Sequence, residues 1–154
     1  MKIKIAWIGK TKEPAIQSLT DEYLKRISRY APVEGIALRD EDALLQLCGC
    51  AASVKAGKPS RNKSTLVLMD SRGKQFSSEE FARFLGEYQD HNPLPLVFAV
   101  GPADGFTEGA RDAAQRTISL GRMTLTHELG RVILLEQVYR AFTILKGHPY
   151  HSGH

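Results

Sequence analysis

Apolar positions follow two different spacings along the chain, and these predict strands and helices in turn. Residues 2–8 alternate lysine with isoleucine, which predicts a strand with one solvent-exposed face. Residues 12–30 place apolar side chains three and four positions apart, which predicts a helix with Pro14 in its first turn. The same spacings predict further strands at 33–38, 64–70, 94–100 and 117–120, and further helices at 42–54, 107–116 and 128–146.

One more helix is marked by its capping sequence. The run Ser77-Ser-Glu-Glu80 fits a capping box, in which the serine oxygen and the glutamate carboxylate each accept from the other residue's backbone N–H. Phe81, Phe84 and Leu85 then fall on one face of the helix that follows. Residues 56–62, rich in glycine, proline, serine and basic residues, form the most loop-like stretch.

The alternation of strand and helix predicts an α/β domain with a largely parallel sheet and helices on both faces. Residues 64–70 and 94–100 are almost continuously apolar, as is typical of central strands covered on both faces. With 154 residues, the chain has the length of one domain, 1–154.

Three segments that follow predicted strands contain glycine, at 71–74, 101–105 and 121–124. Ligands of parallel α/β sheets gather beyond the carboxyl ends of the strands, so these segments predict one ligand cleft. None of them has the spacing of a P-loop or of a dinucleotide-binding loop, and Pro102 lacks a donor N–H. The segment 121–130 also places His127 beside the predicted cleft, as a cap or packing residue or as a functional group.

The last predicted helix is apolar around most of its circumference. A helix on the outside of a monomer normally has one apolar stripe, so this pattern predicts a partner chain on its second side, with Leu134 or Val138 as contacts. Glu136 and Arg140 are spaced to pair along the helix, either within an interface or on an exposed face.

Composition narrows the class further. Hydrophobic residues make up 42% of the chain, and no run approaches the length that a bilayer requires, which excludes a disordered or membrane protein. The first residues lack a secretion signal, so we expect a cytoplasmic protein. The net charge of +4 is compatible with an anionic partner such as RNA.

No metal is expected. Cys48 and Cys50 lack zinc-motif spacing and are predicted to be packed small hydrophobes. Pro149 and Gly153 prevent a rigid helical face for the histidines of the tail, whereas Tyr150 and His151 could contact an RNA base.

Several short motifs occur in an order that resembles the RlmH family, the ribosomal large-subunit pseudouridine methyltransferases of the SPOUT class. These motifs are residues 68–70 with 73–74, 77–82, 101–106, 119–127, Arg131, 136–141 and 148–151. The resemblance implies a C-terminal trefoil knot, a homodimer, S-adenosylmethionine as cofactor, and methyl transfer to N3 of a pseudouridine in large-subunit (23S) ribosomal RNA, on assembled ribosomes.

The resemblance also implies roles for particular residues. Those expected to bind the cofactor, largely through backbone atoms, are Met69, Gly101, Leu120, Gly121, Arg122, Met123, Thr124 and Leu125. Those expected to contact RNA are Arg131, Tyr150 and His151. Thr126 stands where the family usually has proline.

The acceptor N3–H must lose its proton, and the sequence leaves His127, His151 and solvent open as the base. Arg140 is the candidate for stabilising the resulting anion or for gripping a phosphate, so Arg140 and His151, with His127 as the alternative, are the expected catalytic residues. Two other functions stay open: a non-catalytic ribosome-binding factor that uses the basic face, and an α/β enzyme that acts on a small nucleotide.

Overall fold

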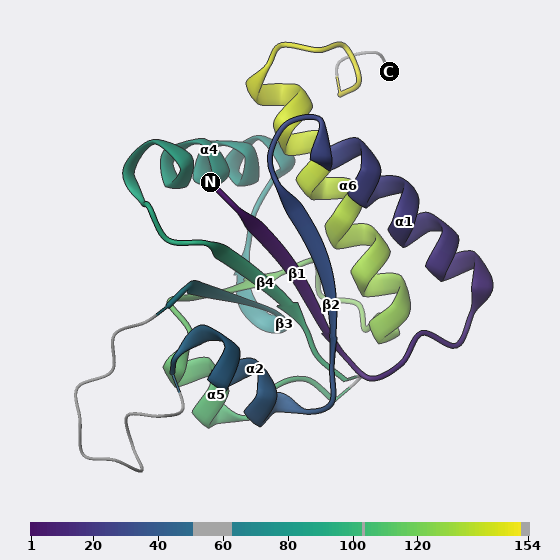
Figure 1. Cartoon of the computed structure of the whole chain (residues 1–154), viewed down its shortest axis with the longest axis vertical. Helices are drawn as coiled ribbons and strands as arrows, with labels where there is room; N and C mark the ends of the chain where they lie inside the picture. Colours follow the sequence, from purple (N-terminus) through teal and green to yellow (C-terminus); the bar gives the residue numbers. More distant parts are fainter. Residues whose placement is uncertain (51–62, 103, 152–154) are drawn as a thin grey trace.

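A parallel sheet organises the part of the chain that the computed structural model describes, residues 1–50, 63–102 and 104–151. Its strand order is β2-β1-β4-β3-β5 (Figure 1). The strands are β1 (Ile3–Ile8), β2 (Val33–Leu38), β3 (Thr65–Gln75), β4 (Leu96–Val100) and β5 (Arg116–Ser119). The helices are α1 (Pro14–Ser28), α2 (Glu41–Cys48), α4 (Ser78–His91), α5 (Glu108–Ala113) and α6 (His127–Leu145). The predicted α/β class with helices on both faces is confirmed.

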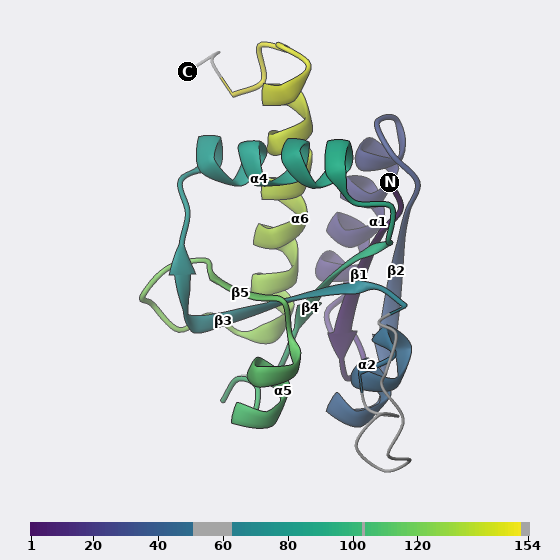
Figure 2. The ribbon, with the colours of Figure 1, turned by 90° about the vertical axis from the view of Figure 1, so that its left-hand side faces the viewer.

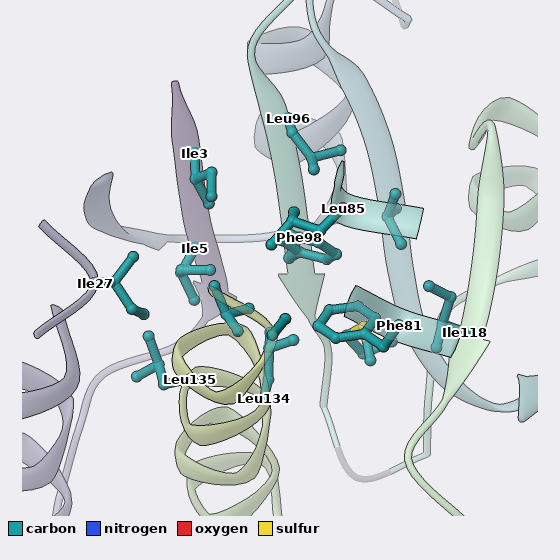
Figure 3. Close-up of a cluster of buried hydrophobic side chains, with 14 of the residues drawn as sticks. Ile3, Ile5, Ile27, Phe81, Leu85, Leu96, Phe98, Ile118, Leu134 and Leu135 are labelled. Carbon is teal, nitrogen blue, oxygen red and sulfur yellow. The ribbon is translucent and has the colours of Figure 1, made fainter. Parts of the chain in front are cut away.

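Alternate residues of the strands supply two separate cores. Ile3, Ile5, Phe98 and Ile118 belong to the larger cluster, which α1, α4 and α6 cover (Figure 3). Ala6, Leu66 and other intervening strand residues belong to the smaller cluster, under α2 and α5. Figures 1 and 2 show α2 and α5 together, apart from α1, α4 and α6. The period-two alternation of a strand therefore decides which helices each side chain meets.

Two helix boundaries follow from local chemistry. The capping box is confirmed, since the Glu80 N–H donates to Ser77 Oγ and the Ser77 N–H donates to Glu80 Oε1, both at 3.0 Å. The helix predicted at 42–54 ends earlier, at Cys48, because Gly49 adopts a left-handed conformation with φ of 77°. Residues 51–54 of that prediction and the predicted loop at 56–62 lie outside the described residues.

Cys48 packs in the smaller core, as predicted. Its side chain is fully buried, and burial raises the pKa of its thiol to about 12. Cys50 packs partly against the same cluster.

The expectation that the strand ends at residue 70, so that residues 71–74 follow it as a connecting segment, is wrong. They lie within β3, which pairs with β5 up to Met69, shifts register, and pairs again from Lys74. A side-chain carbon on Gly73 would lie 2.6 Å from the backbone of Thr117. This glycine therefore permits the close approach of two strands rather than a turn, and a single glycine in the sequence does not distinguish these roles.

The helix α6 is buried on more than one side by its own chain. It packs against both α1 and α4 as well as the sheet, and Leu134 and Val138 are fully buried in the larger core. The expectation that one of these two residues faces a partner is therefore wrong. The outer side of α6 carries Leu129, Val132 and Ile133, of which Leu129 is 50% exposed.

Within the described residues, no helix is both long enough and apolar enough to cross a membrane.

Candidate functional site

One pocket forms where segments from three strands meet. It is lined by the bulged part of β3, by the segment that follows β4, and by the segment between β5 and α6. This confirms that the three glycine-bearing segments share one location. Seven of the eight residues expected to bind a cofactor line it: Met69, Gly101, Leu120, Gly121, Met123, Thr124 and Leu125. Arg122 is exposed and is not among the lining residues.

Asp70 fixes the wall of the pocket, a role that the sequence reading missed. Its carboxylate accepts from the backbone N–H, Nε and Nη2 of Arg72, at 3.0, 2.9 and 2.8 Å, and from the backbone N–H of Phe106 at 3.1 Å. These hydrogen bonds, those of the Arg72 side chain first, hold the pKa of Asp70 well below its usual range. The sequence did contain a signal for this role, because Asp70 directly follows the apolar run 66–69 and stands two residues before Arg72.

Arg72 extends this frame across the pocket. Its Nη2 also donates to the Phe106 carbonyl at 2.8 Å, so β3 is tied to the segment that follows β4. Gly105, with φ of 84°, leaves the room that the pair needs, since a side-chain carbon there would lie 2.8 Å from both Asp70 and Arg72. Two of the three segments are thus held in a fixed relation.

Gly101 is a glycine for a packing reason. A side-chain carbon at this position would lie 2.9 Å from the ring of Phe106, which is buried in the smaller core. A larger residue at position 101 would therefore disturb the fold as well as the pocket. Gly101 thus matters for packing, and not only for leaving room for a ligand.

Gly130 differs from Gly101 in this respect. It lines the pocket from the first turns of α6, and a side-chain carbon there would first meet Val100 Cγ1, at an ordinary 3.8 Å. The backbone at this position is helical, so a side chain could be added without strain.

The segment between β5 and α6 lines the pocket with Leu120, Gly121 and residues 123–127. Gly121 has φ of 147°, and its backbone N–H donates to Ser119 Oγ at 3.1 Å. Thr126 caps α6 by accepting from the Leu129 N–H at 3.3 Å. His127 is the first residue of α6 and lines the pocket. The geometry therefore keeps His127 as a candidate base next to any bound ligand.

Arg140, Tyr150 and His151 form a separate cluster, and none of them lines this pocket. Arg140 donates from Nε and Nη2 to the Glu136 carboxylate, both at 3.1 Å, which confirms the expected pairing along α6. Its Nη1 lies 2.9 Å from His151 Nδ1, and its guanidinium lies 4.9 Å from the centre of the Tyr150 ring. The Tyr150 hydroxyl donates to Glu136 Oε2 at 2.7 Å.

The environment of Tyr150 keeps its hydroxyl protonated. Burial raises the pKa of Tyr150, and the hydrogen bond to Glu136 raises it further. Tyr150 is thus a neutral donor and a packing surface, and not a base. The structure therefore brings together Arg140, Tyr150 and His151, the residues expected to contact the RNA base that accepts the methyl group.

The expectation that Arg131 contacts RNA is wrong. Its side chain is wholly buried, with the guanidinium 3.9 Å from the centre of the Trp7 ring and Nη1 donating to Thr11 Oγ1 at 2.7 Å. Burial lowers the pKa of Arg131. A signal existed in the sequence, because Arg131 precedes the buried Leu134 and Leu135 at helical spacing.

The comparison with known protein families shows which family the chain belongs to. A family model described as "Predicted SPOUT methyltransferase" matches residues 1–151. The chain belongs to this family. It is a SPOUT methyltransferase, and the resemblance carried by its short motifs is confirmed.

Two relatives of this SPOUT methyltransferase are both named ribosomal RNA large subunit methyltransferase H. The protein from Koribacter versatilis (strain Ellin345) is 53% identical over 154 residues, which is 100% of both chains. The protein from Geobacter sp. (strain M21) is 43% identical over 157 residues, covering 98% of this chain and 99% of that one.

A solved structure shares the fold at much lower identity. It is a probable methylase family protein from Haemophilus influenzae Rd KW20, with a TM-score of 0.56 and 10% identity. The match covers 94% of this chain and 66% of that chain.

Proposed function

We propose that this SPOUT methyltransferase transfers a methyl group from S-adenosylmethionine to N3 of a pseudouridine in large-subunit ribosomal RNA, in the cytoplasm. The observation that carries the proposal is the pocket at which the three glycine-bearing segments meet, in a chain whose relatives are named for this RNA. The net charge of +4 agrees with an RNA substrate.

The pocket fits the chemistry of the cofactor. Met69, Val100, Leu120 and Leu125 supply apolar walls for a nucleoside, while Ser71, Thr124 and Thr126 supply polar groups. When bound, the cofactor supplies an electrophilic methyl group on a sulfonium. The chain itself has to hold the acceptor nitrogen in line with that methyl and remove its proton.

The separation between the pocket and the Arg140 cluster supports a shared active site. Arg140, Tyr150 and His151 do not line the pocket of their own chain, so a second chain that places its tail at that pocket would complete it. This is the homodimer that the resemblance implies, with the exposed Leu129 on the outer side of α6 as a contact. Arg140 would stabilise the anion formed at N3, and either His151 or His127 would accept the proton.

We also propose the C-terminal knot that the resemblance implies, and a single domain over residues 1–154, as the chain length indicates. Two cores on the two faces of one sheet support a single domain.

The test is methyl transfer from labelled S-adenosylmethionine to ribosomes, isolated 50S subunits and free RNA from cells that lack this enzyme. We expect one methyl group on N3 of a pseudouridine, located by mass spectrometry of nuclease fragments. Calorimetry with the cofactor alone separates the alternatives, because a non-catalytic ribosome-binding factor would not bind it. Methylation of free nucleotides would indicate an enzyme of small substrates.

A further inference from the structure

Three side chains from distant parts of the sequence form a continuous line at the surface. Glu79 comes from the first turn of α4, Arg140 from α6 and His151 from the tail. His151 Nε2 lies 2.7 Å from Glu79 Oε1, and His151 Nδ1 lies 2.9 Å from Arg140 Nη1. Both ring nitrogens of His151 therefore have a partner. The partner of Nδ1 is a hydrogen-bond donor, and the partner of Nε2 is an acceptor.

The partners decide the tautomer of the ring. A guanidinium has donors and no acceptor, so Nδ1 must accept from Arg140. An ionised carboxylate has only acceptors, so Nε2 must donate to Glu79. A neutral imidazole offers one donor and one acceptor, and only the tautomer with its hydrogen on Nε2 satisfies both contacts.

We propose that Glu79 is a positioning residue that fixes His151 in the tautomer with hydrogen on Nε2, so that Nδ1 is the proton-accepting atom of the tail. Glu79 suits this role because it lies in the first turn of α4, where the helix dipole favours a negative charge. The hydrogen bond from His151 lowers the pKa of Glu79, which keeps it ionised. Glu80 cannot substitute, because its carboxylate is held in the capping box by the Ser77 N–H.

The arrangement sets a proton acceptor beside a cation. Glu136 anchors Arg140 through Nε and Nη2, which leaves Nη1 directed at His151 Nδ1. An imide that displaced this hydrogen bond would place its N3–H at Nδ1 and its developing negative charge at the guanidinium. This pairing rests on the proposed function, whereas the tautomer does not.

The proton transfer balances. The N3–H bond breaks, its electron pair stays on N3, and the proton joins Nδ1 to give an imidazolium that Glu79 stabilises through Nε2–H. The N3 electron pair forms the bond to the transferred methyl, the S–C bond breaks with its pair left on sulfur, and the imidazolium later releases its proton to solvent. An ionised carboxylate behind a histidine base plays the same part in other enzymes, by holding the tautomer and supporting the charged ring.

Nuclear magnetic resonance on the full-length protein labelled with ¹⁵N-histidine tests the tautomer directly. His151→Asn assigns the signals, and we expect Nδ1 unprotonated and Nε2 protonated in the neutral ring. Glu79→Gln should keep this tautomer, because an amide oxygen can still accept from Nε2. Arg140→Met, which removes the donor to Nδ1, should also keep this tautomer, because Glu79 still accepts from Nε2. Adding Glu79→Ala to Arg140→Met should give a mixture, and adding Glu80→Ala, the neighbouring control, should not. Hydrogen on Nδ1 in the unmodified protein, or an unchanged tautomer in the double variant Arg140→Met with Glu79→Ala, would overturn the proposal.

Kinetics with ribosomal substrate supply the second readout. Glu79→Ala should lower kcat roughly tenfold, a part of what a positioned base contributes, with the KM for ribosomes and the Kd for the cofactor unchanged. Glu79→Gln should restore most of that loss. If His151 has the expected tautomer but the ribosomal substrate is not methylated, the proposed function alone is contradicted. If Glu79→Ala keeps full activity, Glu79 has no part in the reaction.

Discussion

The Asp70 carboxylate accepts two hydrogen bonds from the Arg72 guanidinium, of 2.9 and 2.8 Å. The two residues lie two positions apart in the same strand, β3. Only 1% of the Asp70 side chain is exposed, while half of the Arg72 side chain is exposed. Because the Phe106 backbone N–H also donates to Asp70, the pair joins two walls of the pocket.

Loss of the Asp70 carboxylate should weaken both the fold and the pocket. Asp70→Ala leaves the Phe106 N–H and the Arg72 backbone N–H without their acceptor, so we expect the free energy of unfolding to fall by about 2 kcal/mol. Urea denaturation measures this, and calorimetry should show weaker binding of S-adenosylmethionine. Arg39→Ala, which removes a pair between exposed side chains, is the control and should change neither. Unaltered stability in Asp70→Ala would show that the frame is dispensable.

Acid should remove the contribution of Asp70 over a defined range. Its pKa in the folded chain is lower than in the unfolded chain, so the unfolded chain takes up the proton first. The stabilisation is complete above a pH of about 4 and decreases as the pH falls toward the folded-state pKa. Unfolding free energies of the unmodified protein and of Asp70→Asn, measured from pH 6 downward, should therefore converge. Parallel curves across this range would contradict the assignment.

Two pocket glycines should respond oppositely to substitution. Gly101→Val forces a side chain into the Phe106 ring and should lower the free energy of unfolding by about 2 kcal/mol. Gly130→Ala adds a methyl group to a helix without a clash and should raise it by about 1 kcal/mol. Gly130→Leu should keep the fold and lose cofactor binding, because its side chain extends into the pocket. Thermal unfolding with and without S-adenosylmethionine separates these effects; a cofactor-induced rise in Tm for Gly130→Leu would be inconsistent with this pocket.

The outer side of α6 should hold a second copy of the chain. We expect sedimentation near twice 17.1 kDa at micromolar concentration. Leu129→Glu places a charge on this half-exposed position without entering the core, and should give a folded monomer. Leu47→Glu, at a partly buried position of α2 under the opposite face of the sheet, should remain a dimer. A monomer at high concentration in the unmodified protein would refute the two-chain arrangement.

Removal of residues 150–154 should separate catalysis from binding. Of the tail, the structure describes Tyr150 and His151, and neither lines the pocket. Leu129 lies near the start of α6, at the opposite end from the tail, so we expect cofactor affinity and dimerisation to stay nearly unchanged. Methyl transfer should fall by orders of magnitude, because the acceptor would lose its positioning.

Mixing the shortened chain with Gly130→Leu tests whether the site is shared. In a mixed dimer, the tail of the Gly130→Leu chain would serve the intact pocket of the shortened chain, so part of the activity should return. If mixed dimers form and remain inactive, each site is built within one chain.

Periodicity in the sequence determined the elements of this protein and their order. The lysine–isoleucine alternation of β1, the capping box at Ser77 and the apolar run of β4 are local patterns, and each gave the element that the structure contains. The strand-end rule also located the pocket, because parallel strands direct their carboxyl ends to one edge.

Contacts between distant residues determined what those patterns left open. Gly73 and Gly101 resemble turn glycines in the sequence, but their roles depend on Thr117 and on Phe106, which only folding brings close. Arg131 resembles a surface cation until Trp7, Thr11 and Thr20 enclose it. The same holds for the line from Glu79 through His151 to Arg140, since hydrogen bonding acts over about 3 Å, whatever the separation of the residues along the chain.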